Sequence, residues 1–155
     1  MKDLNANCRV RQSGQGLVVL IILLAIIGGG VWWLFSFKNQ RDKEARAFGR
    51  TMIERLTINH DVAFFANSLS PQARLQYPPS NQQYIISKLK ELGVPAQPIA
   101  IEESVTWESH FFRPQAIFIA QLNYPGRAAK IQIATSHPVG KWQLDNLELA
   151  VDTPR

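Results

Sequence analysis

The side chains that could act as general acids or bases are few and are spread along the chain. They comprise three histidines and five carboxylates: His60, His110, His137, Asp61, Glu102, Glu103, Glu108 and Asp145. His137 precedes a proline in an expected turn, which predicts an exposed ring. His60 stands beside Asp61 at an expected helix start, where the helix dipole alone favours an acid. Glu102 and Glu103 are neighbours on an expected strand and therefore point to opposite faces of the sheet. No spacing matches a metal site, a nucleophile elbow or a phosphate loop. We expect no catalytic residue, no metal and no cofactor.

A second set of residues predicts a surface for a ligand or a partner. It comprises aromatic side chains and one histidine on or near the expected strands: Trp107, His110, Phe112, Phe118, Tyr124 and Trp142. Most aromatic side chains of a sheet fill the core. Those that stay accessible can line a pocket for a small apolar ligand or present a surface to a protein. Both alternatives stand.

These residues follow an uncharged segment of 22 residues, from Gly16 to Phe37. At about 1.5 Å per residue a helix of this length spans about 33 Å, close to a hydrocarbon core of about 30 Å. A buried core helix is seldom apolar on every side, and a cleaved signal peptide has a shorter apolar region that ends in small residues. The segment therefore predicts an uncleaved, single-pass membrane anchor. Its expected lipid contacts include seven large side chains: Leu17, Ile21, Leu24, Ile27, Trp32, Trp33 and Phe35.

Small residues interrupt this segment. Ala25 and Gly29 form a small-xxx-small pair, a pattern that lets two membrane helices approach closely. Glycine is also common in membrane helices in general. Contact between two copies of the helix at Ala25 and Gly29 is therefore a hypothesis that competes with a purely compositional explanation.

The excess of 17 basic over 12 acidic residues lies around the apolar segment. Residues 1–37 carry three basic side chains and one acidic one, residues 38–50 carry five and two, and residues 51–155 carry nine of each. Nucleic-acid binding needs a basic face on the folded domain, so we expect no nucleic-acid partner. The excess stands where anionic lipid head groups would meet it.

The orientation of the anchor has two conflicting signals. Five basic residues follow the segment closely and three precede it, so the positive-inside rule favours a cytoplasmic C-terminal part. A short basic tail before one apolar run is, however, the usual start of an exported, anchored domain. We expect a single-pass protein of the cell (inner) membrane whose C-terminal domain is exported to the periplasm.

Beyond the apolar segment the hydrophobic periodicity first fits helices and then strands. Helices are predicted in four stretches: 42–57, 61–68, 70–76 and 80–92. Ser80 and Gln83 form a capping-box pattern at the start of the last one, and Gly93 is placed to end it. Strands are also predicted in four stretches: 99–112, 115–124, 129–134 and 142–149. The short turns between them require antiparallel pairing.

This order of elements predicts an α+β domain, because helices that are segregated from a run of strands pack across one face of a curved sheet. The expected organisation has four parts: a basic tail at 1–15, a transmembrane helix at 16–37, a basic juxtamembrane helical segment at 38–50 and the α+β domain at 51–155.

The last predicted strand carries a resemblance to a known family. The residues from Gly140 to Leu147 read Gly-Lys-Trp-Gln-Leu-Asp-Asn-Leu. They resemble the final strand of small domains of the NTF2-like (cystatin-like) superfamily, as do Leu69-Ser70-Pro71 and the order of helices before strands. The resemblance covers about residues 42–150. It implies a cone, in which a bent four-stranded antiparallel sheet wraps around a long helix, often with an apolar cavity. Such a domain behind one membrane helix is similar in architecture to the VirB8-type proteins of type IV secretion.

The N-terminus has a second resemblance. Basic residues, then Gly16, then an unbroken apolar helix are similar to the start of type IV pilins and pseudopilins, in which a peptidase cuts after the glycine. A glutamate usually stands five residues beyond that glycine. Ile21 occupies this position here, and one class of minor pseudopilin also lacks the glutamate.

Three alternative functions follow. The first is a membrane-anchored, non-catalytic NTF2-like module that binds a protein partner or a second copy of itself and takes part in the assembly of an envelope complex. The second is an NTF2-like enzyme or binder of a small apolar ligand that uses the cone pocket. The third is a minor pilin-like or pseudopilin-like subunit. The first and third need the lipid bilayer and a protein as partners.

Overall fold

The computed structural model describes residues 12–109, 112–138 and 140–152, and the chain divides into two compact units. The first unit ends at Asn39 and the second begins at Gln40. Helix α1 (Gln12–Thr57) contributes to both. Most of the predicted basic tail, together with His110, lies outside the described residues.

The first unit consists of the apolar part of α1. In the described chain one helix is long and apolar enough to cross a membrane, at Gly16–Thr57, and a window of 18 residues in it has a mean hydropathy of 2.7 and no buried residue. The seven residues predicted to contact lipid are each more than half exposed. The helix is consistent with a membrane anchor or a signal sequence. Ala25 and Gly29 lie on its uncovered surface, and the contact predicted there stays a prediction.

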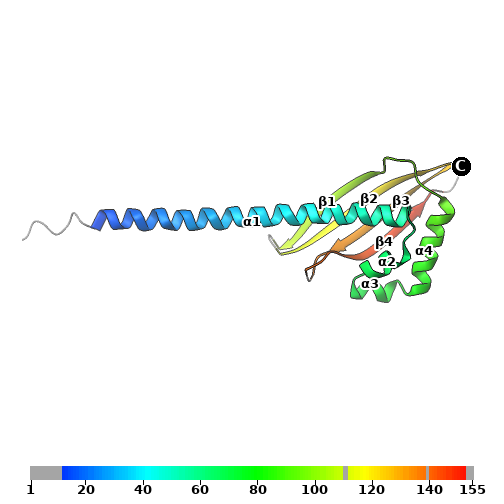
Figure 1. The fold of residues 1–155 in the computed structure, drawn as a ribbon, viewed down its shortest axis with the longest axis horizontal. Helices are drawn as coiled ribbons and strands as arrows, with labels where there is room; N and C mark the ends of the chain where they lie inside the picture. The colour runs from blue at the N-terminus through cyan, green and yellow to red at the C-terminus, as the bar shows by residue number, and fades with distance from the viewer. Residues whose placement is uncertain (1–11, 110–111, 139, 153–155) are drawn as a thin grey trace, which may run out of the picture. The chain divides into compact units, whose positions relative to one another are not determined.

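The second unit contains an antiparallel sheet with the strand order β1-β2-β3-β4 (Figure 1). Its strands are β1 (Ala100–Ser109), β2 (Phe112–Tyr124), β3 (Arg127–Ser136) and β4 (Gln143–Val151). Three helices precede the strands: α2 (Val62–Ser68), α3 (Pro71–Gln76) and α4 (Pro79–Leu92). Each strand pairs with the next one along the chain. The α+β class and the four-stranded antiparallel sheet are therefore confirmed.

One face of this sheet is covered and the other is open. Phe118, Ala120 and Leu122 of β2 are completely buried, whereas Ile117, on the opposite face of the same strand, is 41% exposed. The C-terminal part of α1 supplies four buried residues to the covered face: Ala45, Met52, Ile53 and Leu56. Their helical spacing predicted this apolar stripe, and burial of a stripe on one sheet face explains why the strands alternate.

The sheet is not strongly curled (Figure 1), whereas the resemblance implies a bent sheet that wraps around a long helix. Strands bend sharply at β-bulges, where an extra residue disrupts the ladder. Across the three pairings of the sheet the register shifts once, between Ala134 and Thr135. With a single irregularity the strands have little cause to curl, and they do not wrap far around α1.

Two of the predicted helix starts are confirmed and one is wrong. The Asp61 side chain accepts a hydrogen bond from the Phe64 N–H at 2.9 Å, and Ser70 accepts one from Ala73 at 3.3 Å. Helix α4, however, begins at Pro79 with no side-chain cap, so the capping box at Ser80 does not form. The reason is that proline suits the first helical position, where it has no N–H to leave unpaired.

Gly49 sets how closely α1 approaches the sheet. It is buried against the Phe118 ring, and a Cβ atom added to Gly49 would lie 2.5 Å from two carbons of that ring. No real Cβ atom makes such a contact, so the helix and β2 pack at this distance only because position 49 has no side chain. From the sequence Gly49 reads as a weak point of the helix, whereas the structure shows that packing requires it.

The Gly49→Ala variant is expected to lose about 1–3 kcal/mol of unfolding free energy, because the added methyl overpacks the core. Helix propensity alone predicts the opposite sign, a gain of about 1 kcal/mol. Thermal and urea unfolding of the full-length chain in detergent micelles would measure the difference. Ala47→Gly on the exposed face of the same helix serves as the control for propensity, and a gain in stability for Gly49→Ala would contradict the packing explanation.

Candidate functional site

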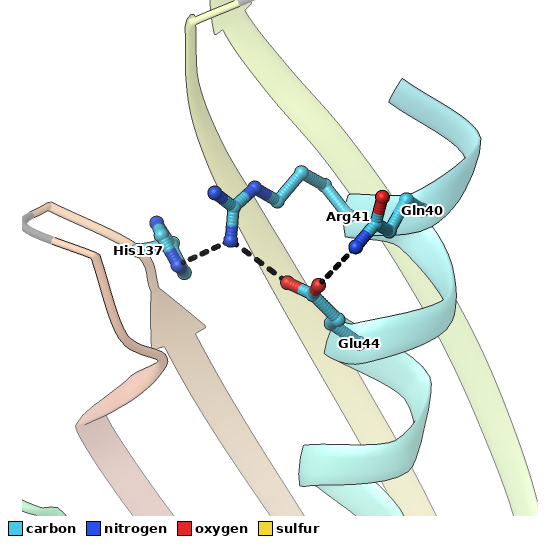
Figure 2. A network of polar contacts seen from close by, with 4 residues as sticks. All are labelled: Gln40, Arg41, Glu44 and His137. Atoms are coloured by element: carbon cyan, nitrogen blue, oxygen red, sulfur yellow. Dashed lines mark hydrogen bonds and ion pairs between the residues drawn. The ribbon is translucent and has the colours of Figure 1, made fainter. Parts of the chain in front are cut away.

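A polar network connects α1 with the segment between β3 and β4 (Figure 2). Arg41 Nη1 lies 2.8 Å from Glu44 Oε2 and 3.1 Å from His137 Nε2, and Gln40 Nε2 donates to Glu44 Oε1 at 3.2 Å. A guanidinium only donates hydrogen bonds. The contact between Arg41 and His137 is therefore a hydrogen bond in which His137 Nε2 accepts. The network thus uses its histidine to connect two elements.

His137 is also held from a second side. Its ring lies edge-on to Trp142, with centroids 5.4 Å apart and an interplanar angle of 67°. Trp142 is 8% exposed. The prediction of an exposed histidine is therefore wrong, because contacts with Arg41 and Trp142 leave the ring half-buried.

A second group of polar contacts connects α1 with β1. Arg50 Nε lies 2.7 Å from Glu103 Oε1, and Arg46 Nε lies 3.6 Å from Glu103 Oε2. The Glu103 side chain is only 9% exposed, and the two arginines supply the charge that allows a carboxylate to be buried there. Farther along the strand, Trp107 Nε1 donates to Asp42 Oδ1 at 3.1 Å.

These contacts change the meaning of the basic excess at residues 38–50. Arg41, Arg46 and Arg50 each pair with a carboxylate of the second unit. Within the described second unit, Lys43 is the basic residue of this stretch that has no ion pair. Much of the positive charge that was expected to meet lipid head groups is therefore paired with carboxylates of the domain itself.

Among the candidate acids and bases that the structure describes, Glu108 and His137 line the same hollow, and the others lie apart from it. His60 Nε2 is buried without a hydrogen-bond partner, and Asp61 caps α2 and pairs with Arg55 at 3.3 Å. Glu102 is exposed, Asp145 is half-buried and Glu108 is exposed beside a hollow. Among the described residues no group of three histidine, cysteine or acidic side chains could hold a metal ion. In this arrangement the polar side chains cap helices and connect secondary-structure elements.

Most of the predicted aromatic surface lies in the core. Phe118, Tyr124 and Trp142 are at most 8% exposed, and Trp107 is half-buried beside Asp42. His110 and the side chain of Phe112 lie outside the described residues. The buried members of the set fill the interior, and their role in a pocket stays a prediction.

The described residues of the second unit line at least two surface hollows, and two of these differ in volume. The larger, of about 330 Å³, is lined by Glu108, Arg113, Pro114, Gln115, Ser136, His137 and Pro138. The smaller, of about 220 Å³, is lined by Arg50, Glu54, Gln97, Pro98, Ile99 and Ile101. Phe118, Tyr124 and Trp142 line neither of them. The larger hollow is mainly polar, whereas the smaller combines apolar side chains with two charged ones.

The chain matches no family model, no curated protein and no solved structure. Function is therefore inferred from the fold and from the contacts described above.

Sequence reasoning missed Arg41, Arg50 and their partners as a connected set. The spacing of Arg41 and Glu44 is the one local signal, because residues three apart on a helix are neighbours. The pairing of Arg50 with Glu103 crosses from a helix to a strand, and it has no local signal.

Tyr124 provides a measurable property of the core. Its hydroxyl is buried without a hydrogen-bond partner, and burial raises the pKa of Tyr124 above its ordinary value of 10.0, because the phenolate is poorly solvated there. The unfolded chain therefore releases this proton at a lower pH than the folded chain does. The stability that this group contributes is complete below about pH 10 and is lost as the pH rises toward the higher pKa of the folded state.

Tyr124→Phe is expected to unfold with a free energy equal to that of the wild type, or up to about 1 kcal/mol higher, near neutral pH, since it removes an unpaired polar group. It should also lose less stability between about pH 9 and 11. Urea unfolding across this pH range would measure both effects. The exposed Tyr84 offers the matched control Tyr84→Phe, and identical alkaline profiles for the two variants would contradict the role given to Tyr124.

Proposed function

We propose that the chain is a single-pass, membrane-anchored, non-catalytic module that works by binding protein in the assembly of an envelope complex. The observation that carries this proposal is the contrast between the two parts of α1. The first part is apolar and uncovered, whereas Ala45, Met52 and Leu56 in the second part lie in the core of a folded domain. Fully burying one large apolar side chain is worth about 1.5–3 kcal/mol, so an uncovered apolar helix of this length needs lipid around it.

We also propose that the second unit is an NTF2-like domain, exported from the inner membrane to the periplasm as in VirB8-type proteins. Support comes from the order of elements and from Ser70, which caps the helix that Pro71 begins. The residues that resemble the family's last strand continue into β4. The uncurled sheet makes this a flatter version of the cone that the resemblance implies.

The open face of the sheet supports protein binding over catalysis. One row across it contains Ser104, Ile117, Ala134 and Asn146, which are paired in register from β1 to β4. This row carries no charge, and its isoleucine is 41% exposed at the centre of the sheet. A broad face with small polar residues around an apolar centre suits a protein contact, either with a partner or with a second copy.

Photo-cross-linking in native membranes tests this proposal. A photoreactive residue would be placed, one site at a time, at four exposed positions of the full-length chain. Three lie on the open face of the sheet, at its centre and on its two edge strands, and one lies on α3: Ile117, Thr106, Ala150 and Leu75. We expect a discrete adduct from Ile117 and none from Leu75, which lies on α3 and serves as the control. If none of these positions yields an adduct, the protein-binding function is wrong.

A pilin-like subunit is the second candidate, and one observation favours it. Helix α1 is unbroken from Gln12 through Gly16 and the three glycines at 28–30, as the pilin resemblance requires of its apolar helix. Intact-mass measurement of the purified chain would decide between the candidates. Removal of the first 16 residues would support the pilin-like function, and a full-length chain would contradict it.

A further inference from the structure

The two edges of the sheet differ in whether their main-chain groups are available. The β4 edge is covered by the segment around α3. The Ser70 N–H donates to the Leu144 carbonyl at 2.9 Å. The Tyr77 hydroxyl accepts from the Leu147 N–H at 3.1 Å, and its single proton faces the Asn146 Oδ1 at 2.6 Å and the Leu147 carbonyl at 3.0 Å. An added strand cannot pair with β4 at these residues.

The β1 edge has no such cover in the part of the chain that the structure describes. There, no hydrogen bond from outside the sheet reaches the main chain of residues 100–106. In an edge strand, every second residue turns its N–H and C=O away from the neighbouring strand. The inward-facing side chains of β1 confirm the opening, because Ile101 and Val105 are half-buried while Ile131 and Ile133 of the inner strand β3 are completely buried.

The smaller hollow lies beside this open edge. We call it the β1 groove; α1 provides Arg50 and Glu54, and the chain leading into β1 provides Pro98, Ile99 and Ile101. Its apolar members can hold the aliphatic part of a side chain. A strand that pairs with β1 turns alternate side chains to this face of the sheet, as in the recognition of extended peptides by an edge strand with a neighbouring pocket.

In the described chain, the carboxylates near the groove that have no ion pair are Glu54 and Glu102. Arg50 also lines the groove and shares the Glu103 carboxylate with Arg46. Glu54 and Glu102 are exposed, and among the described residues neither has an ion pair or a hydrogen-bonded side-chain partner. Glu54 lines the groove, whereas Glu102 lies on the open face of the sheet. A lysine or arginine in the groove can pack its stem on Ile99 and Ile101 and reach Glu54, and a neighbouring one on the open face can reach Glu102.

We propose that β1 is a docking edge for an extended, basic segment of a partner protein, which adds to the sheet as a fifth strand. The inference rests on the proposed protein-binding function and names the kind of partner. In antiparallel pairing of two β1 strands about Val105, Glu102 would lie opposite Glu108, and like charges in directly opposed positions destabilise that register. Pairing of a second copy in another register is an outcome that the cross-linking scan detects.

The test measures binding of a fluorescent peptide to the full-length chain in detergent micelles. The peptide alternates valine and threonine around two adjacent lysines, and a second peptide carries glutamates in place of the lysines. We expect the lysine peptide to bind at least about tenfold more tightly than the glutamate peptide. Equal affinities of the two peptides would overturn the proposal.

Matched variants locate the site. Glu102 and Glu148 lie in one row of the sheet, through Ile119 and Gln132, at opposite edges. Both are exposed. Glu102→Lys and Glu54→Lys are expected to weaken binding of the lysine peptide about tenfold, and Glu148→Lys by less than about twofold. Equal losses at the two edges would show attraction to net charge alone and would overturn the proposal.

N-methylated peptides separate strand pairing from charge attraction. Methylation of alternate residues removes the N–H groups along one edge of the peptide, and two isomers cover its two edges. We expect one isomer to lose binding and the other to retain it, because only one edge faces β1. If both isomers bind like the parent peptide, no strand is added.

The cross-linking scan distinguishes failure of the proposed docking edge from failure of the proposed protein-binding function. An adduct from Ile117 but none from Thr106 on β1 would overturn the docking edge and leave the protein-binding function standing. An adduct at Thr106 with twice the mass of the chain would assign β1 to a second copy and would also overturn the basic partner.

Discussion

The close approach of α1 to the centre of the sheet is the contact on which the second unit depends. Because Gly49 has no side chain, the Phe118 ring lies directly against the helix. The neighbouring turns of α1 then bury Ala45, Met52 and Ile53 in the same core. A helix held farther out would leave a layer of voids, and voids in a protein interior forfeit both dispersion contacts and hydrophobic transfer energy.

The same approach determines the electrostatics of the domain. The helix lies within reach of β1, so Arg46 and Arg50 meet Glu103, and Asp42 meets the indole of Trp107. Arg41 reaches His137 across elements in the same way, while its pair with Glu44 lies within α1 itself. Some polar side chains that could be taken for catalytic acids or bases therefore hold a helix on a sheet instead. The basic character of residues 40–50 belongs in large part to folding.

Patterns that repeat along the chain predicted most of the fold, and contacts between distant residues account for what they missed. The alternation along residues 115–124 predicted a strand, but it did not show which face is buried, because Ile117 and Ile119 opposite Phe118 and Leu122 are apolar as well. The start of α4 was missed because proline at its first position removes the need for the capping box at Ser80. The strongly bent sheet was expected only from the family resemblance. The curl of a sheet depends on β-bulges, which have no reliable sequence signal.

The candidate site was less predictable than the fold for a similar reason. His137 looked exposed because a turn ending in proline normally is, and nothing near it in sequence announces Arg41. Trp107 lies on β1 as predicted, whereas Trp142 stands just before β4, which begins at Gln143. Whether an aromatic ring fills a core or lines a pocket depends on what packs over it. The residues that decide this belong to α1, which lies about sixty or more residues away along the chain.

The hydroxyl of Tyr77, which occupies both main-chain groups of Leu147, limits how large an assembly built on this sheet can become. A sheet with two available sides can polymerise without end, which is the route to fibrils. Here the main chain of Leu144 and Leu147 is already engaged on one side. If two copies paired through their β1 strands, these residues would stand at both outer edges of the joint sheet, and growth from them would be disfavoured.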